Sequence, residues 1–389
     1  MSIKKSEVMK KIKVLYLILV FSVLFCGCVS SENNNLQQNS HQPNETDGRF
    51  TATWLSCYEL KDVLKDGKEE SFKNKIDVLL EKCKVNEINA VFVQVRPFAD
   101  SIYPSELFPV SDYILSAEGE APAFDVMKIL ISKAHSENIE IHAWINPYRV
   151  SYSTDIDDLD QNTVDLIQNN GCKVVCLDEG IYLNPSSLEN QALVLSGVRE
   201  ILENYDVDGI HMDDYFYPLT SSEFDKTEYD TYKKNDGKLR FSDWRRENVN
   251  SLVSSIYSLV HSYSNNIVFS ISPSGDINKN YSSYFADVKL WLEEEGYADM
   301  IIPQLYFGFE NETMPFEKVA LKWMKLNRDD SVKLVFGLAL YKEGQADELA
   351  GKGKNEWVEN SDIIQRQIDY LVNCGYKDFA FFSAFDLSN

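Results

Sequence analysis

The chain has 389 residues, of which 44% are hydrophobic and 12% aromatic, so a full-sized core is available and wholesale disorder is excluded. Its 61 acidic residues outnumber 38 basic ones, and the formal net charge is −23 at pH 7. Because so negative a surface repels phosphate backbones, the composition argues against nucleic acid as a partner. The length fits one large barrel or two ordinary domains.

The N-terminal residues have the parts of a bacterial export signal. Five lysines precede an unbroken apolar run at residues 14–25, which is shorter than the roughly 20 residues that a membrane span needs. Gly27 and Cys28 follow, and this small residue before a cysteine resembles a lipobox. We expect residues 1–27 to be a signal peptide and Cys28 to carry a lipid, so that the protein is exported and held at the cell membrane. Plain secretion and an uncleaved anchor are the alternatives.

Residues 28–48 are polar, rich in Asn, Gln and Ser, and almost free of apolar side chains. A stretch of this composition cannot bury enough surface to fold. We therefore expect a flexible tether that joins the membrane to one folded domain at residues 49–389.

In that domain, short apolar runs rich in β-branched and aromatic residues alternate with helical patterns. The runs are near-continuously hydrophobic, as strands buried on both faces are. The predicted strands span residues 50–56, 90–96, 140–146, 209–214, 267–273, 300–306, 333–340 and 379–385. The predicted helices between them span residues 71–85, 124–138, 188–205, 243–263, 284–295, 316–326 and 361–374. Strands separated in this way by helices predict an α/β fold, the (β/α)₈ TIM barrel.

Two features bear on the barrel prediction. The sequence ends four residues after the last predicted strand, so we expect either a barrel without its final helix or another segment over that gap. A doubly wound open sheet is the alternative fold, but it usually carries a Gly-rich turn after its first strand, where this chain has residues 54–58, Trp-Leu-Ser-Cys-Tyr.

Polar and aromatic side chains gather at the carboxyl ends of the predicted strands, where barrels of this kind build their active sites. The mixture suits a sugar, because amides and carboxylates bond hydroxyl groups while aromatic faces stack on the apolar face of the ring. The predicted substrate-binding residues are Gln94, Arg96, His142, Trp144, Asn146, Tyr148, Arg149, His211, Tyr215, Ser272, Gln304 and Tyr306.

The fourth predicted strand carries the sharpest signal. Side chains alternate along a strand, so His211 and Asp213 face the barrel axis while the apolar Met212 faces the helices. A charge facing the axis must be paired or near water, which places Asp213 at the mouth of the barrel. Asp214 either enters the cleft or bonds loop backbone. Arg96 and Arg149 either pair with these carboxylates and hold them ionised or bind an acidic substituent of a substrate.

The sequence segments that contain these residues resemble the glycosyl-hydrolase-like family ten of exported bacterial barrels and lipoproteins. The matching segments are residues 94–97, 142–149, 208–218, 243–248, 271–275 and 303–306. The resemblance implies a (β/α)₈ barrel and glycoside hydrolysis, with at least one relative acting on peptidoglycan glycan strands. It implies no metal and no organic cofactor.

Glycoside hydrolysis usually needs two carboxyl groups, one to protonate the leaving oxygen and one to act as base or nucleophile. Because its position on the fourth strand resembles that of the catalytic carboxylate in many amylase-like barrels, we assign the second role to Asp213. Asp214 is the first choice for the acid, ahead of Asp100 and Glu310. A non-catalytic glycan-binding lipoprotein is the alternative reading. A metal-dependent deacetylase is a third, but it would need several histidines at ligand spacing, which the sequence does not contain.

Overall fold

The computed structural model of the protein describes residues 48–218, 221, 224–327 and 331–388. The predicted signal peptide, Cys28 and nearly all of the predicted tether lie outside the described residues. Within the described part of the chain, no helix is both long and apolar enough to cross a lipid bilayer.

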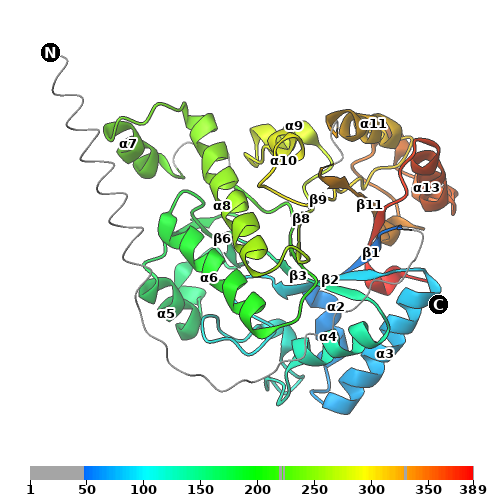
Figure 1. Ribbon diagram of the computed structural model, residues 1–389, viewed down its shortest axis with the longest axis horizontal. Coiled ribbons are helices and arrows are strands. Elements are labelled where there is room, and N and C mark those ends of the chain that lie inside the picture. The colour runs from blue at the N-terminus through cyan, green and yellow to red at the C-terminus, as the bar shows by residue number, and fades with distance from the viewer. Residues whose placement is uncertain (1–47, 219–220, 222–223, 328–330, 389) are drawn as a thin grey trace. The chain divides into compact units, whose positions relative to one another are not determined.

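Parallel strands form a ring at the centre of the domain (Figure 1). All eight predicted strands occur, and the seventh is divided at Val335 into two short strands. The strands are β1 Thr51–Leu55, β2 Ala90–Arg96, β3 Glu140–Ile145, β7 Gly209–Met212, β8 Val268–Ile271, β9 Met300–Ile301, β10 Lys333–Leu334, β11 Phe336–Ala339 and β12 Phe379–Phe382. Their order in the sheet is β10-β9-β8-β7-β3-β2-β1-β12-β11.

The two ends of this order meet, because β10 and β11 follow each other in the chain. Residues beyond β9 also bond to β11: Leu305 N donates to the Gly337 carbonyl at 2.8 Å, and Gly337 N donates to the Pro303 carbonyl at 3.0 Å. A Cβ added at Gly337 would lie 3.0 Å from that Pro303 oxygen and 3.3 Å from the ring of Trp54, so this close approach favours glycine. These bonds close the sheet and confirm the TIM-barrel prediction.

Helices cover the outside of the ring (Figure 1). They are α2 Cys57–Leu64, α3 Glu69–Val85, α4 Val126–Ser136, α5 Gln161–Asn169, α6 Leu188–Asn204, α7 Lys226–Lys234, α8 Phe241–Tyr263, α9 Ile277–Ser282, α10 Val288–Glu293, α11 Phe316–Leu326, α12 Glu356–Glu359 and α13 Ile363–Asn373. All seven predicted helices are confirmed. The unpredicted ones are α2, α5, α7, α9 and α12, which span at most nine residues each, too few for a 3.6-residue period to stand out.

A small antiparallel sheet is inserted after β3. Its strands, β4 Arg149–Ser151, β5 Val174–Leu177 and β6 Gly180–Leu183, lie in the order β4-β6-β5. No strands were predicted here, because strands of three or four residues give too short a pattern to recognise. This insertion places Arg149, and Tyr152 after it, beside the carboxyl end of β3.

The described residues after β12 do not form a long helix. Residues 384–386 form a single 3₁₀ turn, and Leu387 is buried. Two side chains hold this segment, one in α3 and one directly after it. Lys82 Nζ in α3 donates to the Leu387 carbonyl at 3.4 Å, and Asn86 Nδ2 donates to the Ser388 carbonyl at 2.9 Å. The segment after β12 therefore lies against α3, on the side where a final helix was expected.

Glu59 joins the last strand of the barrel to the first. One carboxylate oxygen accepts hydrogen bonds from Ser56 N at 2.7 Å and Ser56 Oγ at 2.8 Å. The other accepts from Ser383 Oγ at 2.6 Å and from Phe385 N at 3.0 Å. Ser56 Oγ also caps α2 by accepting from Glu59 N, which completes a capping box. One buried carboxylate thus fixes the end of β12 against the start of α2.

Removing this carboxylate tests how much the connection contributes. In Glu59→Ala four donors lose their acceptor, so we expect the free energy of unfolding in urea to fall by about 3 kcal/mol. Glu70→Ala, which removes an exposed carboxylate from the first turn of α3, is the control and should lose less than about 1 kcal/mol. Equal losses in the two variants would contradict this account of Glu59.

Candidate active site

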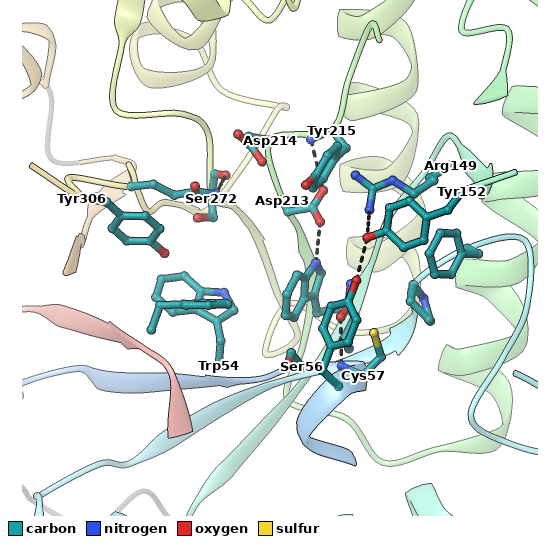
Figure 2. A pocket seen from close by; sticks show the side chains of 17 residues that line it. Trp54, Ser56, Cys57, Arg149, Tyr152, Asp213, Asp214, Tyr215, Ser272 and Tyr306 are labelled. Carbon is teal, nitrogen blue, oxygen red and sulfur yellow. Dashed lines mark hydrogen bonds between the residues drawn. The ribbon is translucent and has the colours of Figure 1, made fainter. Parts of the chain in front are cut away.

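A pocket opens where the strands of the barrel end (Figure 2). Seven of the eight strands, or the loops directly after them, contribute side chains to it, as expected for a barrel of this type. The lining residues are Trp54, Ser56, Cys57, Tyr58, Gln94, Pro97, Phe98, Trp144, Arg149, Tyr152, Asp213, Asp214, Tyr215, Ser272, Gln304, Tyr306 and Phe382. The structure therefore brings both predicted catalytic carboxyl groups together with a large share of the predicted substrate-binding residues.

Asp213 follows β7 and is only 3% exposed. Its Oδ2 accepts a hydrogen bond from Trp144 Nε1 at 3.0 Å, and its Oδ1 accepts one from Tyr215 N at 3.2 Å. These two donors favour the ionised form, but burial and, after it, the neighbouring Asp214 outweigh them and raise the pKa of Asp213 to about 7. The carboxyl group is thus able to take up or release a proton near neutral pH.

Asp214 lines the same pocket but faces another side of it. Figure 2 shows its carboxyl group on the side of Ser272, away from Arg149. Burial raises its pKa as well, while Lys279 and Gln304 favour its ionised form. Two neighbouring carboxyl groups buried together share a proton more readily than both ionise. The pair therefore offers one proton donor and one carboxylate, as acid–base chemistry requires.

His211 lies beneath the pocket and holds one of its walls in place. Trp54 Nε1 donates to His211 Nε2 at 3.1 Å, and because an indole can only donate, that nitrogen carries no proton. His211 Nδ1 must then donate to Ser270 Oγ at 2.8 Å, and burial lowers the pKa of the ring well below its ordinary value. His211 is a neutral residue that positions Trp54, which corrects the predicted substrate contact.

Arg96 and His142 also lie outside the pocket lining. The pairing of β2 with β3 shifts register between Gln94 and Arg96, so Arg96 points outward instead of continuing the inward alternation. Its guanidinium lies 3.9 Å from the centre of the Phe108 ring. His142 is deeper in the barrel, 3.2 Å from Glu140 at the start of β3. The predicted substrate contacts of Arg96 and His142 are therefore corrected to buried structural positions.

Asn146 and Tyr148 support Arg149 from behind and do not line the pocket. Asn146 Oδ1 accepts a hydrogen bond from Arg149 N at 3.2 Å, which shapes the turn after β3. Tyr148 is fully buried in the outer hydrophobic core. Both side chains are buried outside the pocket lining, so the structure corrects their predicted contacts with substrate.

The two weaker candidates for the acid are also absent from the lining. Asp100 accepts a hydrogen bond from Phe98 N at 3.0 Å, and burial raises its pKa to about 6. Glu310 is exposed, and its backbone N donates to Glu356. Asp214 is thus the carboxyl group that the structure places beside Asp213.

Arg149 is the only lysine or arginine among the described residues that line the pocket. Its guanidinium lies 3.8 Å from the centre of the Tyr215 ring and 5.0 Å from that of Tyr152, whose hydroxyl accepts from Nη1 at 3.0 Å. Its Nε is buried without a hydrogen-bond partner. The charge of Arg149 makes a small contribution that favours the ionised form of Asp213.

The sequence analysis missed the part of the wall that follows β1, together with Phe98, Tyr152 and Phe382. The residues at 54 and 56–58 were recoverable, because they occupy the carboxyl end of a predicted strand as Asp213 does. Cys57 is among them, and burial raises the pKa of its thiol to about 12, so it is a neutral side chain and not a nucleophile.

Comparisons with known proteins agree with this arrangement. Residues 49–358 match the model of the family described as Glycosyl hydrolase-like 10. Glycosyl hydrolase YngK of Bacillus subtilis is 32% identical over 324 residues, which are 77% of this chain and 62% of YngK. Glycosyl hydrolase DigH of Escherichia coli is 29% identical over 307 residues, 72% of this chain and 68% of DigH. The match thus spans less than two thirds of YngK.

Two solved structures share the fold. The glycoside hydrolase domain of PgaB (BpsB) from Bordetella bronchiseptica has a TM-score of 0.58 at 12% identity, covering 86% of this chain and 93% of that domain. Alpha-L-fucosidase isoenzyme 2 from Paenibacillus thiaminolyticus has a TM-score of 0.57 at 12% identity, covering 88% of this chain and 47% of the fucosidase. The barrel is therefore one that glycosidases use.

The raised pKa of Asp213 has a measurable consequence for stability. The folded protein keeps this proton up to about pH 7, whereas the unfolded chain releases it near the ordinary value of 3.8, so this group makes stability fall as the pH rises through that window. Asp213→Asn removes the effect. We expect the variant to gain stability over wild type as the pH rises, by at most roughly 4 kcal/mol above pH 7.

Urea unfolding of both proteins at about pH 5 and about pH 8 measures this difference. Asp243→Asn is a control of opposite sign, because Arg246 and Arg240 lower the pKa of Asp243 and stabilise its charge. That variant should lose stability relative to wild type once the pH is above the ordinary range of a carboxyl group. The same pH dependence in both variants would contradict the assignment for Asp213.

Proposed function

Because this chain belongs to the glycosyl hydrolase-like 10 family, we propose that it is a glycoside hydrolase that cleaves O-glycosidic bonds of a polysaccharide. The observation that carries the proposal is the adjacent carboxyl pair, Asp213 and Asp214, in a pocket lined mainly by aromatic and amide side chains. Hydrolysis by two carboxyl groups needs one proton donor and one carboxylate. The pair supplies both near neutral pH, since burial opposes the ionisation of both groups together.

In this mechanism Asp213 holds the proton and Asp214 the charge. Asp213 is the deeper group with the pKa of about 7, and the bonds from Trp144 and Tyr215 hold it in one orientation. Asp214 has Lys279 and Gln304 to favour its ionised form. Asp213 then protonates the leaving oxygen while Asp214 acts as base or nucleophile, the reverse of the assignment from strand position.

Peptidoglycan glycan strands are the proposed substrate. The family resemblance and the expected position at the outer side of the cell membrane support it. Incubation of the purified protein with peptidoglycan and with peptide-free glycan strands, followed by mass analysis, is the test. New reducing ends support hydrolysis, retention of the glycan without cleavage supports the alternative of a glycan-binding lipoprotein, and released acetate supports a deacetylase.

Substitution of the two carboxyl groups tests their roles. Asp213→Asn and Asp214→Asn should each lower kcat on glycan by roughly 10³-fold or more, at least about 4 kcal/mol of transition-state stabilisation. On an aryl glycoside, whose leaving group needs no proton, Asp213→Asn should recover much of its activity and Asp214→Asn should not. Asp112→Asn, an exposed carboxyl group outside the pocket lining, is the control and should keep full activity. Full activity of a correctly folded Asp213→Asn protein on glycan would exclude this mechanism.

We also propose that the protein is a lipoprotein anchored through Cys28. The lysine-rich start, the short apolar run and Gly27 before Cys28 support this proposal. Cys28→Ala should leave the membrane fraction and keep its activity, because the described residues that line the pocket all lie between Trp54 and Phe382, after the tether. Cys26→Ala, two residues earlier, should stay in the membrane fraction. Fractionation followed by immunoblotting measures both, and a membrane-bound Cys28→Ala protein would contradict the anchor.

A further inference from the structure

Aromatic side chains form two clusters at the pocket, one on each side of the carboxyl pair. The Tyr58 cluster consists of Tyr58, Phe98, Tyr113 and Tyr152, and the Tyr306 cluster consists of Tyr306, Tyr341 and Phe382. Figure 2 shows Tyr152 and Tyr306, one from each cluster, on opposite sides of Asp213. The carboxyl pair thus lies between two aromatic surfaces.

The Tyr58 cluster is a closed cycle of contacts. Tyr58 packs edge-on against Tyr113 at 5.2 Å, Tyr113 stacks with Phe98 at 5.9 Å, and Phe98 packs edge-on against Tyr152 at 4.9 Å between ring centres. A hydrogen bond of 2.7 Å between the hydroxyls of Tyr58 and Tyr152 closes the cycle. Although held from several sides, Tyr58 is 55% exposed and Tyr152 is 50% exposed. These two rings are ordered and yet open to solvent.

The Tyr306 cluster is a triangle that extends beyond the pocket. Tyr306 and Phe382 line the pocket, and Tyr341 packs edge-on against both, at 6.0 Å and 5.9 Å between ring centres. Tyr341 is not part of the lining and is 36% exposed. It therefore continues the aromatic surface outward from Tyr306, away from the carboxyl pair.

We propose that the two clusters are sugar-binding platforms, so that the glycan lies across the pocket and is cleaved within its chain and not at its end. The inference rests on the proposed function. Contiguous exposed aromatic side chains mark binding surfaces, whereas isolated ones need no explanation. The apolar face of a sugar ring fits a flat aromatic ring, and Tyr hydroxyls can bond the sugar hydroxyls. Rings already held in place lose little conformational entropy when a sugar binds.

The position of the carboxyl pair decides between internal and terminal cleavage. The bond that breaks must lie at Asp213 and Asp214, between the clusters. A glycan that ended at this point would use only one cluster, and the other would remain exposed to solvent without a ligand. Tyr341 lies outside the pocket lining, so it should contact a sugar residue beyond the pair joined by the cleaved bond, whereas Tyr58, which lines the pocket and is 55% exposed, should contact the glycan on the other side of that bond.

Glycan strands of mixed length and the shortest oligosaccharide that the wild type cleaves are the substrates for the test. Wild type should release products of many sizes from long strands at early times. Tyr58→Leu and Tyr341→Leu should each lower kcat/KM on long strands about tenfold, the effect of roughly one lost stacking contact. On the short oligosaccharide Tyr341→Leu should lose less than about twofold, because Tyr341 lies outside the pocket lining. Tyr341→Phe keeps the ring and should lose less activity on long strands than Tyr341→Leu.

Tyr281→Leu is the control, since Tyr281 is 46% exposed, packs against Arg246 and does not line the pocket. It should cleave both substrates as wild type does. Release of a single product size from chain ends would overturn the proposal. Equal losses on long and short substrates in Tyr341→Leu would also overturn it, because they would indicate a structural role.

The failure of the two platforms can be distinguished from the failure of the proposed function. If the wild type releases no reducing ends, the proposed function fails, and the platforms are then tested by retention of long glycan strands in affinity electrophoresis. Weaker retention by Tyr58→Leu and Tyr341→Leu, with unchanged retention by Tyr281→Leu, would support the platforms in a binding protein. Unchanged retention by all three variants would overturn them.

Discussion

The closed ring of parallel strands is the constraint on which the rest of the structure depends. Since every strand runs in the same direction, residues distant in the chain reach one rim: Trp54 from β1, Trp144 from β3 and Asp213 after β7. Two local features secure the closure. Gly337 allows β11 to approach the chain after β9, and Glu59 fixes the end of β12 beside α2. Gly337 and Glu59 also contact residues of the pocket lining, since Gly337 lies against Trp54 and Glu59 bonds Ser56. The contacts that close the barrel therefore also fix part of the pocket wall.

The dry interior of the barrel determines the chemistry at its mouth. Below the pocket, Phe92, Trp54 and His211 pack ring against ring, and His211 is held neutral by a donor on one nitrogen and an acceptor on the other. This layer excludes water from beneath Asp213. Burial then raises the pKa of that carboxyl group, and the adjacent Asp214 adds to the effect. Packing that stabilises the barrel therefore also creates a proton donor at neutral pH.

Much of the fold was predictable because buried parallel strands are continuous apolar runs, and each predicted run became a strand. The site was predictable only where side chains alternate regularly. Asp213 follows that rule, but the register shift after Gln94 turns Arg96 out of the barrel, and no period-2 pattern reveals such a shift. His142 and His211 do face the barrel interior, yet sequence spacing does not tell how deep a residue lies. The position of Tyr152 was not predicted, because the short antiparallel sheet after β3 that positions it has no periodic sequence pattern.

The energetics of Asp213 help to distinguish a hydrolase from a protein that only binds glycan. Binding can rest on the aromatic clusters and on amides such as Gln304, none of which needs a buried charge. A buried carboxyl group beside a second one lowers stability at neutral pH. An amide in the same place could accept from only one of the two donors, Trp144 Nε1 or Tyr215 N, because its NH₂ group cannot accept a hydrogen bond. In a protein that only binds glycan, this loss of folding stability would serve no function. Acid–base cleavage uses it directly, since the same desolvation that destabilises the carboxylate keeps a proton available for the leaving oxygen.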